Sequence, residues 1–271
     1  MAVVGNTELT ATKNALIAAL VQRELISKAV VMPTILDASA WAVKGAKSVA
    51  FPRAGSLSVE DRATITQAAL VGVTYAVDTI VFNQMSTISW LVDPQDEIES
   101  SIDVQADMAA RAAKAHAKNF DTLVIAGLET ASTATTTAGA VSKAIFLEMR
   151  QQLLAANADP GQLTFLCGPD SESALLNIGD FVQSYAYGSA VIPSGVLGKL
   201  FGVEVKIQTG IGANAFYMYD KSGYGFAIQK SLQMDERAAP EYGSGAVLKV
   251  LDMKWGHAAL ENSLLLRKDN N

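Results

Sequence analysis

The sequence predicts a mixed α+β fold, and three stretches of the chain support this prediction. Residues 96–128 predict a long helix, because seven of the thirteen residues from 106 to 118 are alanine, the best intrinsic helix former. Residues 71–92 are rich in Val, Ile, Tyr, Phe and Trp, which favour strands. After residue 137, helical and strand patterns alternate along the chain, which is typical of an α/β segment.

The composition is apolar for a chain without a membrane segment. Half of the 271 residues are hydrophobic, 18% are charged, and the mean hydropathy is +0.22. No window approaches the roughly eighteen uncharged apolar residues of a membrane-spanning helix. The first residues lack the basic region and apolar core of a signal peptide. We therefore expect much of the apolar surface to be buried against other chains.

Charge and cysteine content exclude further classes of protein. The net charge of −6 argues against tight, sequence-specific nucleic-acid binding, which needs a basic face. It is compatible with a container whose wall does not adhere to its contents. The single cysteine, Cys167, excludes an internal disulfide and is typical of a reducing compartment. It lies in an apolar run, LTFLC, which predicts a buried and unreactive thiol.

Residues 1–40 are interpreted as an arm that leads into a helix. Thr10 or Thr12 can cap a helix over Lys13–Ser27. Pro33 then ends any helix or strand formed by the residues just after that helix. The first dozen residues have no pattern of their own, so we expect them to need a partner to become ordered.

Residues 41–95 predict extended structure. Lys47–Arg53 alternates like a strand, and Pro52 restricts it to a sheet edge. A polar turn region over 54–62 precedes the β-prone run that ends at Val92. Two strands around a polar tip would form a hairpin too long for local contacts alone to support. Such a hairpin folds onto its own domain or lies on a neighbouring subunit, and both alternatives stay open.

Residues 96–136 contain the long helix. Ser100 and Ser101 can cap its first free amides. An apolar stripe with helical spacing follows, formed by Met108, Ala112, Ala115 or His116, and Phe120. A Ser/Thr/Ala-rich connector over 129–138 separates this helix from the rest of the chain.

The remaining residues predict short helices and strands in alternation. Helices are expected over Val141–Asn157 and Glu172–Asn177, and strands over Leu163–Cys167 and Gly202–Thr209. A hairpin is expected to pair residues 216–219 with residues 225–229, and two closing strands are expected over 247–255 and 258–266.

Signatures of catalysis and metal binding are missing from the sequence. His116 and His257 have no Cys or carboxylate at metal-ligand spacing, and the common phosphate-loop, serine-nucleophile and zinc-hydrolase motifs do not occur. We expect no catalytic residue, no metal and no cofactor. Gly210–Ala215 matches GxGxxA after a strand, but a dinucleotide site needs a helix next, and strand residues follow. We interpret this match as a tight glycine turn.

The order of the predicted helices and strands along the chain resembles that of a known family. A short arm and helix precede a long hairpin around AFPRAGSLSVEDR, whose return strand VGVTYAVDTIVFNQ leads through WLVDPQDEIESSIDVQADM into the alanine-rich helix. An α/β segment with LGKLFGVEVKIQTGI and YGFAIQK follows, and VLKVLDMKWGHAAL supplies closing strands. This order resembles the major capsid protein of tailed bacteriophages, which has the Hong Kong 97-like fold. The resemblance covers nearly the whole chain and lies in the order of elements.

The resemblance implies five segments. They are an N-terminal arm and helix (1–40), an extended hairpin called the E-loop (41–95), a peripheral domain with a spine helix (96–136), an axial domain (137–230) and return strands of the peripheral domain (231–271).

The resemblance also implies contact residues. Hairpin side chains are expected to contact neighbouring subunits: Lys47, Phe51, Arg53, Glu60, Asp61 and Arg62. A loop at the capsomer centre is expected to contribute Tyr185, Tyr187 and Ile192.

The implied function is structural. Such a chain self-assembles into pentamers and hexamers of an icosahedral shell around double-stranded DNA, without sequence-specific contacts and without a membrane. The virion would be assembled in the cytoplasm of a host bacterium. Because forty residues before the hairpin cannot hold the long scaffolding segment of some relatives, we expect a separate scaffolding protein or none, together with portal and decoration proteins. The alternatives are an encapsulin-like cellular compartment and a small nucleotide-dependent α/β enzyme that uses the Gly210–Ala215 turn.

Overall fold

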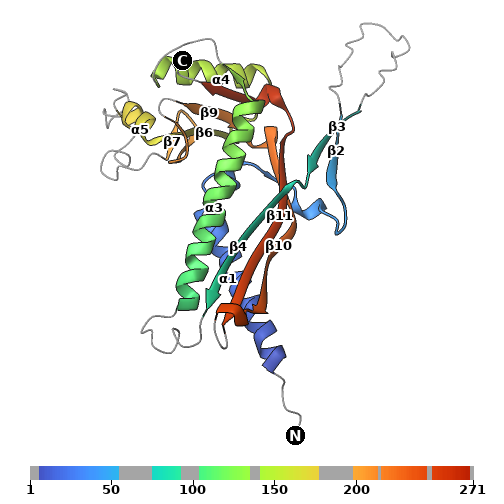
Figure 1. Ribbon diagram of the computed structural model, residues 1–271. Coiled ribbons are helices and arrows are strands. Elements are labelled where there is room, and N and C mark those ends of the chain that lie inside the picture. Colours follow the sequence, from blue (N-terminus) through green and yellow to red (C-terminus); the bar gives the residue numbers. More distant parts are fainter. Residues whose placement is uncertain are drawn as a thin grey trace, which may run out of the picture.

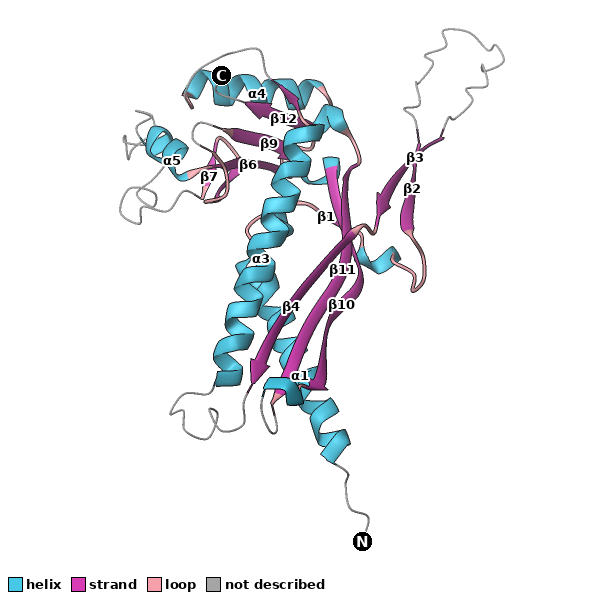
Figure 2. Cartoon of the chain, in the orientation of Figure 1, coloured by secondary structure: helices cyan, strands magenta, loops and turns pink. Residues whose placement is uncertain are grey.

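The computed structural model describes residues 6–54, 75–92, 104–134, 141–176, 198–212, 215–242 and 246–268. These residues form a four-stranded sheet, a six-stranded sheet and a two-stranded hairpin that projects sideways (Figure 1). The expected α+β fold is confirmed, and Figure 2 shows helices and strands interleaved along the molecule.

The four-stranded sheet is covered on one face by two long helices. Its strand order is β1 (Leu36–Asp37), β10 (Tyr224–Ala238), β11 (Val247–Ala259) and β4 (Gln84–Val92), and only the β1–β10 pair is parallel. Helices α1 (Asn6–Lys28) and α3 (Val104–Ala131) pack against each other and against this sheet. Their apolar faces therefore share one core with the inward side of the sheet.

Helix α3 is the alanine-rich helix that the sequence predicts. Its 28 residues span about 40 Å. Ala112, His116 and Phe120 of the predicted stripe are buried, and Phe120 stacks on Trp255 of β11 with ring centroids 4.5 Å apart. The helix continues past Gly127, where a Cβ atom would lie 2.0 Å from the Tyr224 hydroxyl of β10. Glycine therefore stands at this position because helix and sheet approach too closely for a side chain. The predicted caps Ser100 and Ser101 lie outside the described residues.

The expected start of the first helix is wrong. We predicted a helix from Lys13 after an arm without pattern, whereas α1 begins at Asn6. Residues 6–12 contain no proline or glycine, so they extend the helix although no apolar period marks them. After α1, the chain turns through η1 (Met32–Thr34), which contains Pro33, into β1 and then η2 (Ser39–Trp41).

The six-stranded sheet forms the second body. Its order is β5 (Thr133–Ala134), β12 (Leu265–Lys268), β9 (Phe216–Asp220), β6 (Leu163–Cys167), β8 (Val203–Ile207) and β7 (Lys199–Leu200). Helix α4 (Lys143–Ala155) packs on it and is capped by Ser142, whose hydroxyl accepts a hydrogen bond from the Ile145 amide. Helix α5 (Pro169–Leu176) follows β6. Cys167 is buried as expected, and burial raises the pKa of its thiol to about 12.

One predicted strand pairing and one predicted strand boundary are wrong. Residues 216–219 do not pair with residues 225–229: β9 lies between β6 and β12, and the turn η3 (Lys221–Gly223) carries the chain to β10 in the other sheet. Both strands are apolar enough to be buried centrally, so composition could not reveal their partners. Two closing strands are present, as expected, but their bounds differ: β11 continues through Gly256 to Ala259, and the second strand, β12, begins only at Leu265.

Other segment assignments change with these pairings. Residues 84–92 do not run back along the hairpin, because they form β4 and pair with β11. The expectation that residues 231–271 all return to the part of the molecule with the long helix is wrong, because β12 pairs with β5 and β9 in the six-stranded sheet. Within the described residues, no helix is long and apolar enough to cross a membrane.

Candidate assembly surfaces

The hairpin consists of β2 (Ser48–Ala54) and β3 (Tyr75–Val81), which pair only with each other among the described strands. Figure 1 shows it standing away from both sheets. A two-stranded ribbon is marginally stable in water, so its position depends on how its base is held.

The base of the hairpin is tightly packed. Val49 and Ile80, paired in register, are buried with Phe82, Ala38 and Ala227. The Phe82 amide donates to the Lys47 carbonyl at 3.0 Å, which closes the base of the ribbon.

The hairpin also crosses β11 at close range. A Cβ atom on Gly256 would lie 2.0 Å from the carbonyl oxygen of Val81, so a glycine is needed there. On the other side, the Gln229 side chain donates to the Ala46 carbonyl. The angle at which the hairpin leaves the body is therefore fixed by contacts to the backbone at its base.

Above its base, the hairpin presents an uncovered apolar face. Tyr75, Val77 and Val81 alternate along β3 and therefore point to one side. Tyr75 and Val77 are each 64% exposed, and Val81 is 49% exposed. Pro52 of β2 lies opposite Val77 and is also exposed. An apolar face on a ribbon with free edges is typical of a surface that another chain covers.

The predicted hairpin contact residues fall into two groups. Lys47 is exposed just before β2. Phe51 is half-buried and makes a T-shaped contact with Trp41, with ring centroids 5.2 Å apart. Arg53 lies in β2 opposite Ala76 in the backbone register. Glu60, Asp61 and Arg62 lie outside the described residues, as do Tyr185, Tyr187 and Ile192 of the predicted capsomer-centre loop. Their expected contacts stay predictions.

A buried carboxylate ties the arm to both bodies. Asp121 of α3 is 2% exposed and accepts hydrogen bonds from the amides of Val30 and Val31, at 3.0 and 3.1 Å. It also accepts one from the Gln208 side chain, which follows β8, at 2.6 Å. One side chain thus joins the end of α1, the long helix and the six-stranded sheet.

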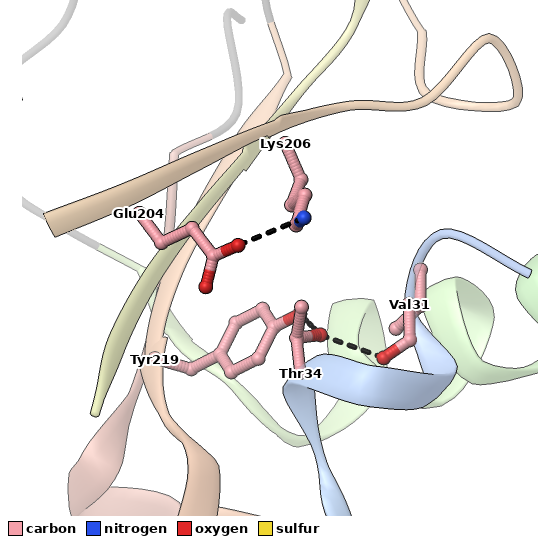
Figure 3. A network of polar contacts seen from close by, with 5 residues as sticks. All are labelled: Val31, Thr34, Glu204, Lys206 and Tyr219. Carbon is pink, nitrogen blue, oxygen red and sulfur yellow. Dashed lines mark hydrogen bonds and ion pairs between the residues drawn. The ribbon is translucent and has the colours of Figure 1, made fainter. Parts of the chain in front are cut away.

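A second set of contacts reinforces this junction. The hydroxyl oxygens of Tyr219 in β9 and Thr34 lie 2.7 Å apart, and Thr34 donates to the Val31 carbonyl at 2.6 Å. Figure 3 shows these residues together. Beside them, Glu204 and Lys206 of β8 form an ion pair at 2.8 Å. Burial raises the pKa of the Tyr219 hydroxyl, which stays protonated and available for this contact.

Two opposing effects act on the pKa of Asp121. Burial raises the pKa of this carboxyl, and the hydrogen bonds from Val30, Val31 and Gln208 lower it, with burial the larger effect. Three donors around one carboxylate make the site specific for an acceptor, because a donor in its place would face other donors. Asp121 therefore positions the arm.

A groove lies where the arm crosses the sheet. It has a volume of about 520 Å³ and is lined by α1, the segment from η1 to η2, and β10, with Met32, Ile35 and Phe226 in its wall. Strand β1 covers β10 only at Gly225 and Phe226. Beyond Phe226, no described strand pairs with this edge of β10.

The residues considered for cofactor chemistry occupy structural positions. The stretch after β8 leads into strand β9 and not into a helix, so Gly210 and Gly212 lack the helix N-terminus that holds a pyrophosphate. His257 meets the Tyr224 hydroxyl through Nδ1 at 2.7 Å, and His116 is buried on α3. Burial lowers the pKa of both imidazoles. Within the described ranges, no group of three or more His, Cys, Asp or Glu is placed to hold a metal.

Comparisons with known proteins show similarity only in structure. No protein-family model matches the chain, and no curated protein matches it. The capsid of cyanophage P-SCSP1u matches with a TM-score of 0.69 and 16% identity, over 88% of this chain and 87% of that one. A structure of Mycobacterium phage Che8 matches with a TM-score of 0.68 and 17% identity, over 83% and 85%. A virus-like particle from Pyrococcus furiosus matches with a TM-score of 0.65 and 11% identity, over 95% and 99%.

The chain has the Hong Kong 97-like fold. The expectation drawn from the order of elements is thereby confirmed for the fold.

Several residues that shape the Hong Kong 97-like fold here escaped the sequence analysis. Asp121, Thr34 and Tyr219 form the junction, and Gly256 sets the crossing of the hairpin. The available signal was weak: Asp121 is a lone carboxylate directly after Phe120 in the apolar run FDTLVIAGL.

Proposed function

We propose that this chain is the major capsid protein of a tailed bacteriophage, a structural and non-enzymatic subunit. It forms pentamers and hexamers of an icosahedral shell that encloses double-stranded DNA, in a virion assembled in the host cytoplasm. The observation that carries the proposal is the projecting hairpin with an uncovered apolar face, on a fold shared with phage capsid proteins.

The proposal assigns roles to the parts of the chain. The arm (1–40) and the hairpin bind neighbouring subunits, the long helix and the four-stranded sheet form the peripheral body, and the six-stranded sheet lies toward the capsomer centre. The hairpin side chains Lys47, Phe51 and Arg53 and the loop with Tyr185, Tyr187 and Ile192 contact adjacent copies. A separate scaffolding protein, a portal and decoration proteins complete the particle.

Negative-stain microscopy and light scattering of the expressed chain test the proposal. We expect closed particles with capsomers, from the chain alone or with a co-expressed scaffolding protein. Irregular aggregates from the chain alone that become regular shells on co-expression would support the separate scaffolding protein. A monomer at every concentration, with and without such a partner, would contradict the proposal.

A second candidate is the shell of a cellular compartment, which the comparisons favour no more than a phage shell. The Pyrococcus furiosus virus-like particle matches 95% of this chain and 99% of its own. The contents of purified, nuclease-treated particles separate the two functions. Protected double-stranded DNA supports the phage shell, and a co-purifying enzyme without DNA supports the compartment.

A further inference from the structure

We infer that the solvent face of α3 binds the phosphate backbone of the enclosed nucleic acid through Arg111, Lys114 and Lys118. The inference rests on the proposed function and names the surface that meets the contents of the shell.

The three cations form one stripe along the helix. They follow each other at steps of three and four residues, so they lie on the same side of α3, and all three are exposed. The stripe is about 10 Å long. Because the opposite side of α3 packs against α1 and the four-stranded sheet, this stripe points away from the body of the subunit.

No exposed carboxylate interrupts the stripe. Between Asp107 and Glu129, the only acidic residue of α3 is Asp121, which is buried and hydrogen-bonded on the inward side. Arg111 pairs with Asp107 at 2.8 Å, but both side chains are largely exposed and such pairs are weak. Lys114 and Lys118 form no ion pair with any described residue.

The surface between the cations is smooth. Between Arg111 and Lys118 the one other exposed residue of α3 is Ala115, and the short residues Thr122 and Ala126 follow before Glu129. Short side chains allow a second molecule to approach the helix, while the longer Lys and Arg side chains reach out to it.

The opposite side of the subunit differs. On the face of the four-stranded sheet that points away from α1 and α3, Lys230 pairs with Asp252 at 2.6 Å, and Asp235 and Arg237 place both signs along β10. A surface that serves solubility alone mixes both signs in this way. In a chain with a net charge of −6, the stripe on α3 therefore contrasts with the mixed charges of this second face.

Charge complementarity selects a polyanion as the occupant. Double-stranded DNA carries one negative charge per about 1.7 Å of its axis, so a stripe of about 10 Å faces several phosphates. Three cations per subunit give weak binding without sequence preference, and a closed shell repeats it over many copies. This reconciles an acidic protein with a nucleic-acid content.

The test measures binding of a random-sequence 30-base-pair duplex to the full-length subunit by fluorescence anisotropy at several salt concentrations. The double variant Lys114→Gln and Lys118→Gln removes two cations from the stripe. The control, Arg237→Gln with Lys254→Gln, removes two cations from the opposite face and has the same net charge. Each lost phosphate contact lowers the slope of log affinity against log salt by about 1.

We expect the slope to fall by about 2 in the stripe variant and to stay unchanged in the control. Equal losses in both variants, or no loss in either, would overturn the inference. Tighter binding of polyglutamate than of the duplex would also overturn it, because the face would then suit an acidic protein.

Electron microscopy separates this inference from the proposed function. If the unaltered chain forms no particles under any condition, the proposed function fails. If the stripe variant forms normal particles that protect as much DNA from nuclease as the unaltered chain, the inference fails and the proposed function stands. Normal particles with less protected DNA support both.

Discussion

The helix–sheet body and the hairpin differ in how they satisfy their apolar side chains. In the body, α1 and α3 cover the four-stranded sheet, and Phe120 and Trp255 are fully buried between them. In the hairpin, only the base is buried, and Tyr75 and Val77 face solvent. The body can therefore fold by itself, whereas the hairpin is complete only when another molecule covers it. The following experiments test that contrast.

The largest effect is expected in the core of the body. Phe120→Ala removes a ring that stacks on Trp255 and makes a T-shaped contact with Phe226, with ring centroids 5.3 Å apart. We expect a loss of about 3–5 kcal/mol in the free energy of unfolding, measured by urea denaturation of the unassembled subunit. A loss below about 1 kcal/mol would show that this core does not hold the subunit together.

The junction at Asp121 comes next. Asp121→Asn replaces one acceptor oxygen with an amide donor among three donors, so at least one buried N–H loses its partner. We expect a loss of about 1–3 kcal/mol in the free energy of unfolding. Asp107→Asn, which breaks only an exposed ion pair, is the control and should change stability by less than about 1 kcal/mol.

The crossing between hairpin and body gives a comparable effect. Gly256→Ala places a Cβ atom against the backbone of Val81. Backbone atoms cannot move aside as the flexible end of a side chain can. We expect a loss of about 1–3 kcal/mol, measured by urea denaturation, together with faster amide exchange at Phe82. Gly210→Ala, where a Cβ atom meets nothing within 4 Å, is the matched control. Equal effects of the two variants would contradict the tight crossing.

The histidines of the body predict a moderate pH dependence. Burial lowers the pKa of His116 and His257 in the folded chain below the ordinary value of 6.5. Below that pH, the unfolded chain takes up protons that the folded chain resists, so stability falls as the pH decreases. The pKa of Asp121 is raised, so this carboxyl acts in the opposite direction.

A variant isolates the contribution of the histidines. We expect the free energy of unfolding to fall between pH 7.5 and pH 5.5, as measured by urea denaturation, and to fall less in His116→Leu. An identical pH dependence in both proteins would exclude His116 as a source.

The hairpin should show the smallest effect on the subunit and a large effect on assembly. Val77→Ser changes an exposed side chain, so the free energy of unfolding should change by no more than about 0.5 kcal/mol. Particle yield, measured by sedimentation and microscopy, should fall because a contact with the neighbouring subunit becomes polar. Thr79→Ser, on the same face, is the control. Normal assembly of Val77→Ser would weaken the role of this face.

The sequence was sufficient for features with a strong local signal. Alanine content predicted α3, Pro52 predicted an edge strand in β2, and the apolar run around Cys167 predicted β6. The order of elements predicted the fold.

Features that depend on distant partners could not be predicted. The consecutive strands β9 and β10 belong to different sheets, and their partners lie far away in the chain. The same holds for Asp121, because its donors lie in Val30, Val31 and Gln208. A carboxylate in an apolar run does not reveal what surrounds it. The hairpin face was visible only as β-prone residues until the register placed Tyr75, Val77 and Val81 on one side.

The position of β12 bears on when the subunit becomes competent to assemble. Leu266 pairs with Thr133 and Met218, so the six-stranded sheet cannot close until residue 268 has left the ribosome. Contacts between such distant residues form late and slowly. A chain whose strand β12 has not yet emerged therefore lacks the complete six-stranded sheet, which delays polymerisation on polysomes until synthesis has passed this strand.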